Sequence, residues 1–175
     1  MTKPHAQTCP VATFLNIFGD AWTWLIVREA FYGATRFGEF QRNTGAAKNL
    51  LSERLNKLVA EGFLERKDMG TSGPRYEYFL TEKGKSLIPV LATMVQWSNE
   101  HIHGEGGEPV FLIDGKHNQL LPKIGALGTD GREMKWGDIL VRVGPGSNRL
   151  ARERVEASPF HEGKKKLPKR VQPSN

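Results

Sequence analysis

Polar side chains recur at helical spacing along the segment 48–66, KNLLSERLNKLVAEGFLER. At 100° per residue, Asn49, Asn56 and Lys57 point away from the leucines of this segment, and Ser52 lies at their flank. Amide, hydroxyl and ammonium groups are donors that can bind base edges and phosphate oxygens in a groove. An ordinary solvated helix would have the same polar face, so the neighbouring elements must decide between a solvated helix and a helix that binds in a groove.

A hairpin is predicted directly after this helix. Gly62 ends the helix, residues 63–69 predict a strand, GTSGP at 70–74 predicts a tip, and RYEYFL at 75–80 alternates as a second strand. A polar-faced helix followed by a basic-tipped hairpin is typical of a winged helix-turn-helix. In that motif the second helix of the pair enters the major groove and the hairpin flanks it on the backbone.

Further helices are predicted on the N-terminal side. Residues 10–18 begin with Pro10, which suits a first helical turn. Asp20 is a good N-cap for a helix over 21–32, and residues 37–44 predict a short helix before the one that opens at 48.

A long helix is predicted to follow the hairpin. It begins after Thr81 as N-cap and runs to about His103, with Pro89 either bending it or lying near its first turns. The predicted fold is therefore mainly α with small β: a winged helix-turn-helix with flanking dimerisation helices. The apolar face of the long helix consists of Leu87, Val90, Leu91, Met94 and Trp97.

The residues expected to bind DNA surround the polar face. Lys48 lies where a helix N-terminus favours phosphate, Arg36 and Arg42 bracket the preceding helix, and Lys67 and Arg75 flank the hairpin tip. The full candidate set is Arg36, Arg42, Lys48, Asn49, Ser52, Arg54, Asn56, Lys57, Lys67 and Arg75.

Two arginines have alternatives. Arg54 lies nearer the apolar face of its helix, so DNA contact and an intramolecular ion pair are both open. Arg28 is expected to be structural and to pair with a carboxylate, either one near Glu29 or Asp20, and this choice is open.

Several motifs occur together in the order and spacing of one family. They are a Cys-Pro start at Cys9, Gly-x-x-Trp-Thr, Arg-Phe-x-x-Phe, Leu-Ser-x-Arg-Leu and Tyr-x-Leu-Thr-x-x-Gly. Over residues 9 to about 103 the chain resembles the HxlR-type bacterial winged-helix transcriptional regulators. The resemblance implies a homodimer whose terminal helices form the interface, bound to operator DNA. Many members open the recognition helix with Ser-Pro-Lys, whereas Ala47, Lys48 and Asn49 stand here, so the hydroxyl cap is missing and the operator preference is expected to differ.

Cys9 is the one cysteine of the chain. At a helix start its thiol pKa should be lowered, and in the resembling family this Cys serves some members as an oxidant or electrophile sensor. A quiet, partly buried Cys is the alternative. No His or Asp lies in a recognisable hydrolase motif, so we expect no enzyme.

Metal and cofactor sites are not expected. His101 and His103 have no Cys partner and are predicted to be solvated or at a dimer rim. Some relatives carry a C-terminal extension with paired cysteines like a zinc ribbon, but those cysteines are missing here, so neither zinc nor another cofactor is predicted.

The charge of the chain hints at a polyanionic partner, although part of the charge lies in the C-terminal tail, and the single cysteine favours a reducing cytoplasm. The net charge is +6 and the pI about 9.5, which favours a polyanionic partner. No apolar run approaches the ~20 residues of a membrane span, and we expect no membrane contact or signal peptide. The expected location is the cytoplasm, at the bacterial nucleoid.

Four segments are predicted. Residues 1–103 form the DNA-binding and dimerisation domain and 104–108 a linker. Residues 109–146 form a small β-rich C-terminal appendage, in which ILVRV at 139–143 is the clearest strand and Phe111 and Trp136 could line a pocket. Residues 147–175 form a basic, partly disordered tail.

The function predicted from the sequence is a homodimeric, sequence-specific transcriptional regulator, expected to be a repressor, on a palindromic operator in double-stranded DNA. Its input would be a small-molecule effector or a redox or electrophile signal. The alternative is a winged-helix protein-interaction module without sequence-specific DNA binding. The operator, the regulated genes and the effector are open.

Overall fold

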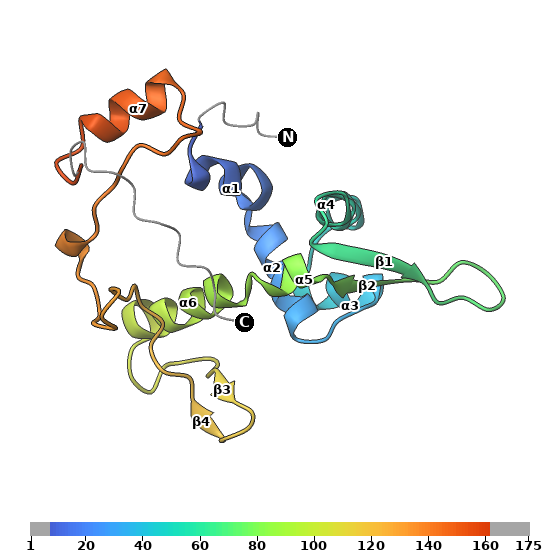
Figure 1. Cartoon of the computed structure of the whole chain (residues 1–175). Helices are drawn as coiled ribbons and strands as arrows, with labels where there is room; N and C mark the ends of the chain where they lie inside the picture. Colours follow the sequence, from blue (N-terminus) through green and yellow to red (C-terminus); the bar gives the residue numbers. More distant parts are fainter. Residues whose placement is uncertain (1–7, 162–175) are drawn as a thin grey trace. The chain divides into compact units, whose positions relative to one another are not determined.

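The computed structural model describes residues 8–161 and contains the predicted winged helix-turn-helix. Three helices, α2 (Ala21–Phe31), α3 (Phe37–Thr44) and α4 (Lys48–Ala60), are followed by the strands β1 (Leu64–Asp68) and β2 (Tyr76–Leu80). The β1–β2 hairpin, called the wing below, extends outward from the three helices (Figure 1).

The apolar side of α4 holds this unit together. Leu51, Leu55 and Leu58 are completely buried, as are Ile26 of α2 and Phe40 of α3. Burying one such side chain stabilises a fold by about 1.5–3 kcal/mol. The inward face predicted from helical spacing is thereby confirmed, and the polar side of α4 must face outward.

The residues at the helix ends explain where the helices begin and end. Asp20 caps α2, because its carboxylate accepts the backbone N–H of Thr23 at 3.0 Å. Gly62 ends α4 in a left-handed conformation, with φ of 73°. Ala47 begins α4 without a side-chain cap hydrogen bond, as the missing hydroxyl predicted.

The wing is a regular antiparallel pair. Its register runs from Leu64 opposite Leu80 to Asp68 opposite Tyr76. At the tip, Asp68 Oδ1 accepts the backbone N–H groups of Gly70 and Arg75, each at 2.9 Å. These bonds hold the pKa of Asp68 below its usual value, the bond from Arg75 being the stronger cause.

The predicted single long helix is wrong. The chain forms a short helix α5 (Glu82–Lys85), then α6 (Ile88–Ser98), and then a π-helical turn (Asn99–His103). Pro89 lies in the first turn of α6, as one of the two predicted placements required. A proline lacks the N–H that a continuous helix would need there, so the helix restarts.

Residues after the π-helical turn pack against α6. The strands β3 (Ile113–Asp114) and β4 (Gln119–Leu120) form a small antiparallel hairpin. Gln96 of α6 donates to the carbonyl of Pro122 at 3.0 Å and accepts the N–H of Ile124 at 2.8 Å.

The chain divides into two compact units. Within the described residues, one consists of Phe18–Gly125 and the other of residues 8–17 with residues 126–161. Residues 109–125 belong to the same unit as α6, and the four predicted segments stay a prediction.

The second unit contains α1 (Pro10–Phe18) except for its last residue, a 3₁₀ turn (Trp136–Asp138) and α7 (Arg149–Glu156). The predicted strand at 139–143 is wrong. Val141 makes only a single bridge to His161, and a segment becomes a strand only where a partner of similar length pairs with it.

The tail predicted to be partly disordered begins with α7, and its residues 162–175 lie outside the described part. Across residues 8–161, no single helix is long and apolar enough to cross a membrane. The consecutive helices α1 and α2 reach the length and apolar composition of a membrane span only when they are taken as a pair.

Gly84 of α5 provides a test of how closely the wing packs on the helices. A Cβ at this position would collide with the carbonyl oxygen of Phe63 and lie 2.9 Å from Leu80 Cδ2. Gly84→Ala should therefore lower the free energy of unfolding by about 1–3 kcal/mol, measured by urea denaturation. The matched control is Gly38→Ala in α3, where nothing lies within 4 Å of the added Cβ. Equal stability of the two variants would contradict the close packing.

Candidate nucleic-acid interface

The outer face of α4 presents the predicted reading residues. Lys48, Asn49, Ser52 and Asn56 are exposed, and Lys57 is half-buried. Glu53 is exposed on the same face and could accept from cytosine N4. Because the leucines of α4 fix the rotation of the helix, these polar groups present one continuous face.

Arg54 takes the intramolecular alternative in this structure. Its side chain is only 17% exposed, with Nε 3.1 Å from Asp20 Oδ2 and one Nη 2.7 Å from Glu53 Oε1. Since Asp20 also accepts the Thr23 hydroxyl at 2.7 Å, one carboxylate joins the start of α2 to the middle of α4. Whether Arg54 also contacts DNA stays a prediction.

Asp20 is ionised more readily than a free aspartate. Partial burial acts to raise the pKa of its carboxyl, but the bonds from Thr23 and the charge of Arg54 outweigh that effect and lower the pKa. The carboxylate therefore remains charged through the neutral and mildly acidic range.

Glu29 makes a second junction, between α2 and α3. It is buried and lies 2.7 Å from the guanidinium of Arg28, while Asn43 Nδ2 donates to its other oxygen at 2.8 Å. Arg28 is structural, as predicted, but its partner is Glu29. Asp20, one of the suggested partners, is occupied by Arg54.

Arg36 and Arg75 meet at Glu77 of β2, near the outer end of the paired wing strands. Arg36 Nε donates to Glu77 Oε1 at 3.0 Å, and an Nη of Arg75 lies 3.4 Å from the same oxygen. Glu77 is only 8% exposed. Glu77 was not among the residues predicted from the sequence, although an acidic residue in an aromatic-rich strand between predicted basic residues was a usable signal.

Lys67 and a further arginine lie along the wing strands. Lys67 Nζ is 2.7 Å from Glu65 and 5.3 Å from the centre of the Phe79 ring. Arg66, which sequence reasoning missed, stacks its guanidinium 4.6 Å from the Tyr76 ring. Such cation–π contacts hold a flexible cation in place while leaving it accessible.

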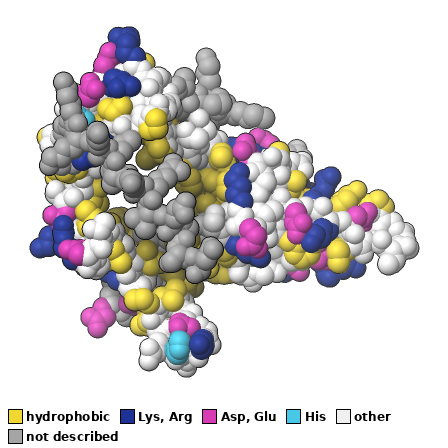
Figure 2. Space-filling model, in the orientation of Figure 1, with side chains coloured by type: hydrophobic (Ala, Val, Ile, Leu, Met, Phe, Trp, Pro, Cys, Tyr) yellow, Lys and Arg dark blue, Asp and Glu magenta, His cyan; other side chains and the backbone are white. Residues whose placement is uncertain are grey.

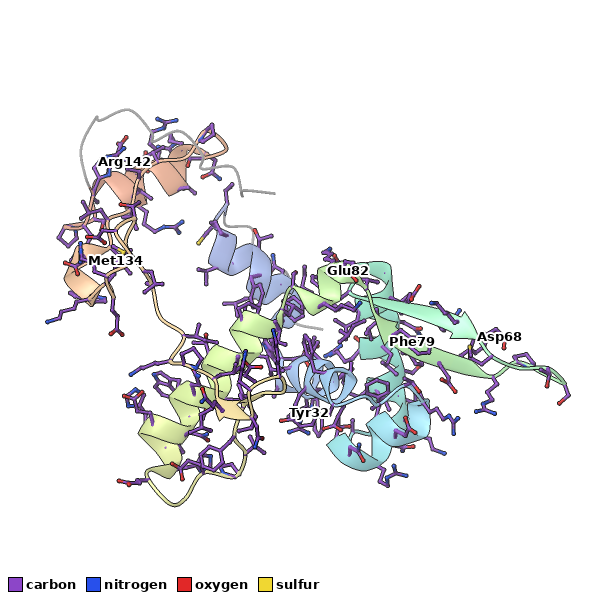
Figure 3. The ribbon with its side chains drawn as sticks, turned by 60° about the horizontal axis from the view of Figure 1, so that its bottom comes forward. Tyr32, Asp68, Phe79, Glu82, Met134 and Arg142 are labelled. Atoms are coloured by element: carbon purple, nitrogen blue, oxygen red, sulfur yellow. The ribbon has the colours of Figure 1, made fainter. Side chains whose placement is uncertain are left out.

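The surface of the wing mixes charges. Figure 2 shows Lys and Arg interspersed with Asp and Glu along this part of the molecule. In Figure 3, Asp68 lies toward the outer end of the wing and Phe79 nearer the helices. Arg42, in the last turn of α3, is exposed, and its contact with DNA stays a prediction.

Cys9 lies in the other unit, just before α1. It is half-buried. Backbone N–H groups of Ala12 and Val11 at the helix start lower the pKa of its thiol, and the charge of Arg154 acts in the same direction. The lowered pKa agrees with the prediction for a helix start, and sensing stays a prediction.

A cavity of about 470 Å³ lies between α6 and the residues that follow it. Phe111 lines it together with Val95 and Leu121, whereas Trp136 packs against Phe160 with ring centres 4.4 Å apart and is not among its lining residues. Among residues 8–161 there is no cluster of three His, Cys, Asp or Glu side chains that could hold a metal ion.

Comparison with known proteins gives one consistent result. The model of the HxlR-like helix-turn-helix family matches residues 17–105. The uncharacterised HTH-type transcriptional regulator Rv3095 of Mycobacterium tuberculosis is 39% identical over 102 residues, which is 58% of this chain and 65% of the relative. The chain thus spans slightly less than two thirds of that relative. YvaP of Bacillus subtilis, also an uncharacterised HTH-type transcriptional regulator, is 36% identical over 62% of this chain and 97% of its own length.

A solved structure extends the similarity. PA1607, a protein proposed to be a transcription factor, superposes with a TM-score of 0.71 at 38% identity, covering 80% of this chain and 96% of that one.

The ion pair between Asp20 and Arg54 predicts how stability depends on pH. Because the folded pKa of Asp20 lies below the unfolded value of about 3.9, the carboxylate stabilises the fold above that value. The contribution is lost as the pH falls through the folded pKa. Asp20→Asn keeps an N-cap but removes the ion pair, so the variant should be less stable at pH 7 by about 1 kcal/mol.

The measurement is urea unfolding of both proteins from pH 7 down to the acid limit of the fold. The two stabilities should converge below about pH 4. Curves that stay parallel through the acid range would show that Asp20 contributes no charge-dependent stability.

Proposed function

Because the chain belongs to the HxlR-like helix-turn-helix family, whose relatives are transcriptional regulators, we propose that it binds operator DNA sequence-specifically as a homodimer. The observation that carries the proposal is the outer face of α4. Exposed amide, hydroxyl and ammonium donors share one side of a helix whose other side carries the completely buried Leu51, Leu55 and Leu58.

The proposed docking places α4 in the major groove. Asn49 and Asn56 would read base edges, for which Asn pairs best with adenine. Lys48 would contact phosphate at the helix N-terminus, and Lys67 and Arg75 of the wing would contact the adjacent backbone or minor groove.

The proposed dimer uses α6. Val90, Met94 and Trp97 lie at helical spacing on one side of α6 and are 39%, 43% and 55% exposed. An apolar stripe of this kind marks an interaction surface. On α1, Val11 and Leu15 are also exposed and are the second candidate contact. A two-fold dimer would pair two copies of α4 and require a palindromic operator.

Two inputs fit the chain. The lowered thiol pKa of Cys9 favours reaction with an oxidant or electrophile. The cavity beside α6 has a volume suited to a small-molecule effector. Either would act next to a helix of the proposed dimer interface, α1 or α6.

The test is fluorescence anisotropy of the protein on its own upstream intergenic DNA and on a scrambled fragment over a salt series. The proposal requires about a thousandfold preference for the operator-containing fragment. Weak, equally salt-sensitive binding to both fragments, and to fragments selected from random DNA, would overturn it. The interaction-module alternative would then hold.

In the same assay, Asn49→Ala and Lys48→Ala should differ. Loss of a base contact at Asn49 should cost about 1–3 kcal/mol and relax preference at one base position. Loss of a phosphate contact at Lys48 should weaken binding to all sequences alike and reduce the salt slope by about one. Negligible effects from both variants would contradict this docking.

The dimer has its own test. Met94→Asp places a charge in the apolar stripe of α6 and should convert the protein from dimer to monomer in light scattering. Ile88→Asp is the control, because Ile88 is also exposed on α6 but lies on the opposite side from the stripe. A protein that remains dimeric with Met94→Asp would exclude this interface.

A further inference from the structure

The strand β2 is joined to the helices by a buried carboxylate. Glu77 is 8% exposed and accepts three side-chain donors. They are the Thr35 hydroxyl at 3.1 Å, Arg36 Nε at 3.0 Å and an Nη of Arg75 at 3.4 Å.

The donors come from segments far apart in the chain. Thr35 and Arg36 lie just before α3, while Arg75 and Glu77 belong to the wing. The backbone reinforces the junction, because the N–H of Tyr78 donates to the Thr35 carbonyl at 2.8 Å. Glu39 fixes the other side of the turn by accepting the N–H groups of Thr35 and Arg36.

The two arginines stay accessible to solvent although both pair with the carboxylate. Both share one oxygen of Glu77, and their side chains remain 56% and 57% exposed. Two guanidinium groups held this close would repel each other without the carboxylate between them. The cluster of three groups keeps a net charge of +1 and presents several free edges for a phosphate.

The carboxylate itself is ionised. The hydrogen bond from Arg36 lowers the pKa of Glu77 against the opposing effect of burial, and the Thr35 hydroxyl adds to the lowering.

We propose that Glu77 is a positioning residue for DNA binding: it fixes the wing to the turn before α3 and holds Arg36 and Arg75 together as one phosphate-binding pair. The role in DNA binding rests on the proposed function, whereas the junction itself does not. Glu77 does not touch the DNA in this scheme. It sets where the wing lies relative to the face of α4, and so converts a mobile pair of cations into a fixed one.

The variants are Glu77→Gln and, as control, Glu65→Gln. Gln keeps the shape and one acceptor but removes the charge that holds two guanidinium groups. Glu65 is an exposed carboxylate on the other strand of the same wing, and its ion pair in the described part of the chain is with Lys67 of the same strand. Both substitutions raise the net charge by one, so any general electrostatic gain in DNA affinity is shared.

The first measurement needs no DNA. Amide hydrogen exchange of the full chain reports the bond from Tyr78 N–H to the Thr35 carbonyl. Glu77→Gln should increase exchange at Tyr78 about tenfold or more relative to wild type, and Glu65→Gln should leave it unchanged. Unchanged protection in Glu77→Gln would overturn the proposal, whatever the DNA result.

The second measurement compares operator and scrambled DNA. Glu77→Gln should lower the specific-to-nonspecific ratio about tenfold, while binding to scrambled DNA stays the same or rises. A merely structural loss would reduce both affinities in proportion to the unfolded fraction. A ratio equal to that of Glu65→Gln would overturn the positioning role. If wild-type protein itself showed no preference, the proposed function would fail instead, and the exchange result would still decide the junction.

Discussion

The burial of one side of α4 is the constraint on which the rest of the interface depends. Leu51, Leu55 and Leu58 leave no surface exposed, so the helix cannot rotate without bringing apolar groups into water. At about 1.5–3 kcal/mol for each side chain, that constraint exceeds any single polar contact on the outer face. The donors on the other side are therefore positioned before any ligand arrives, and binding need not supply the energy to orient the helix.

Three carboxylates then join elements that the apolar core only brings near. Asp20 links α2 to α4 through Arg54, Glu29 links α2 to α3 through Asn43, and Glu77 links β2 to the turn before α3. Each accepts more than one donor, so a partly buried charge is compensated rather than left unpaired. Apolar packing tolerates small rotations, whereas these directional bonds fix how the helices and the wing lie relative to each other.

Much of this unit could be predicted from local sequence. The periodicity of the leucines, the cap at Asp20 and the strand over RYEYFL each follow from the chemistry of neighbouring residues, and the structure confirms them, although burial along β2 does not alternate. The prediction of one long helix failed because Pro89 was compatible either with a bend or with a place in the first turns of a helix, and the spacing alone did not choose between them. The strand at 139–143 failed because β-propensity describes one segment, while a strand requires a partner.

The carboxylate junctions were predicted least well, for a related reason. Glu77 and Arg36 are distant in sequence, and the residues around either one do not indicate the other as its partner. Arg54 shows what helical spacing cannot predict. Its angle on the helix allowed either DNA contact or an intramolecular ion pair, and only the position of Asp20 in the fold shows which partner it takes. Long-range ion pairs depend on tertiary geometry, which periodicity does not encode.

The paired charges of the wing also bear on how such a surface could select DNA. The net charge of +6 suggests a general attraction to polyanions, yet Lys67, Arg36 and Arg75 each lie beside a glutamate. A phosphate that approaches them must compete with a carboxylate already in place, which weakens attraction to arbitrary sequences. Only DNA that also satisfies the donors of α4 gains enough to compensate. Partial neutralisation at the rim would therefore favour specificity over bulk affinity, and it makes two linked modules necessary for tight binding.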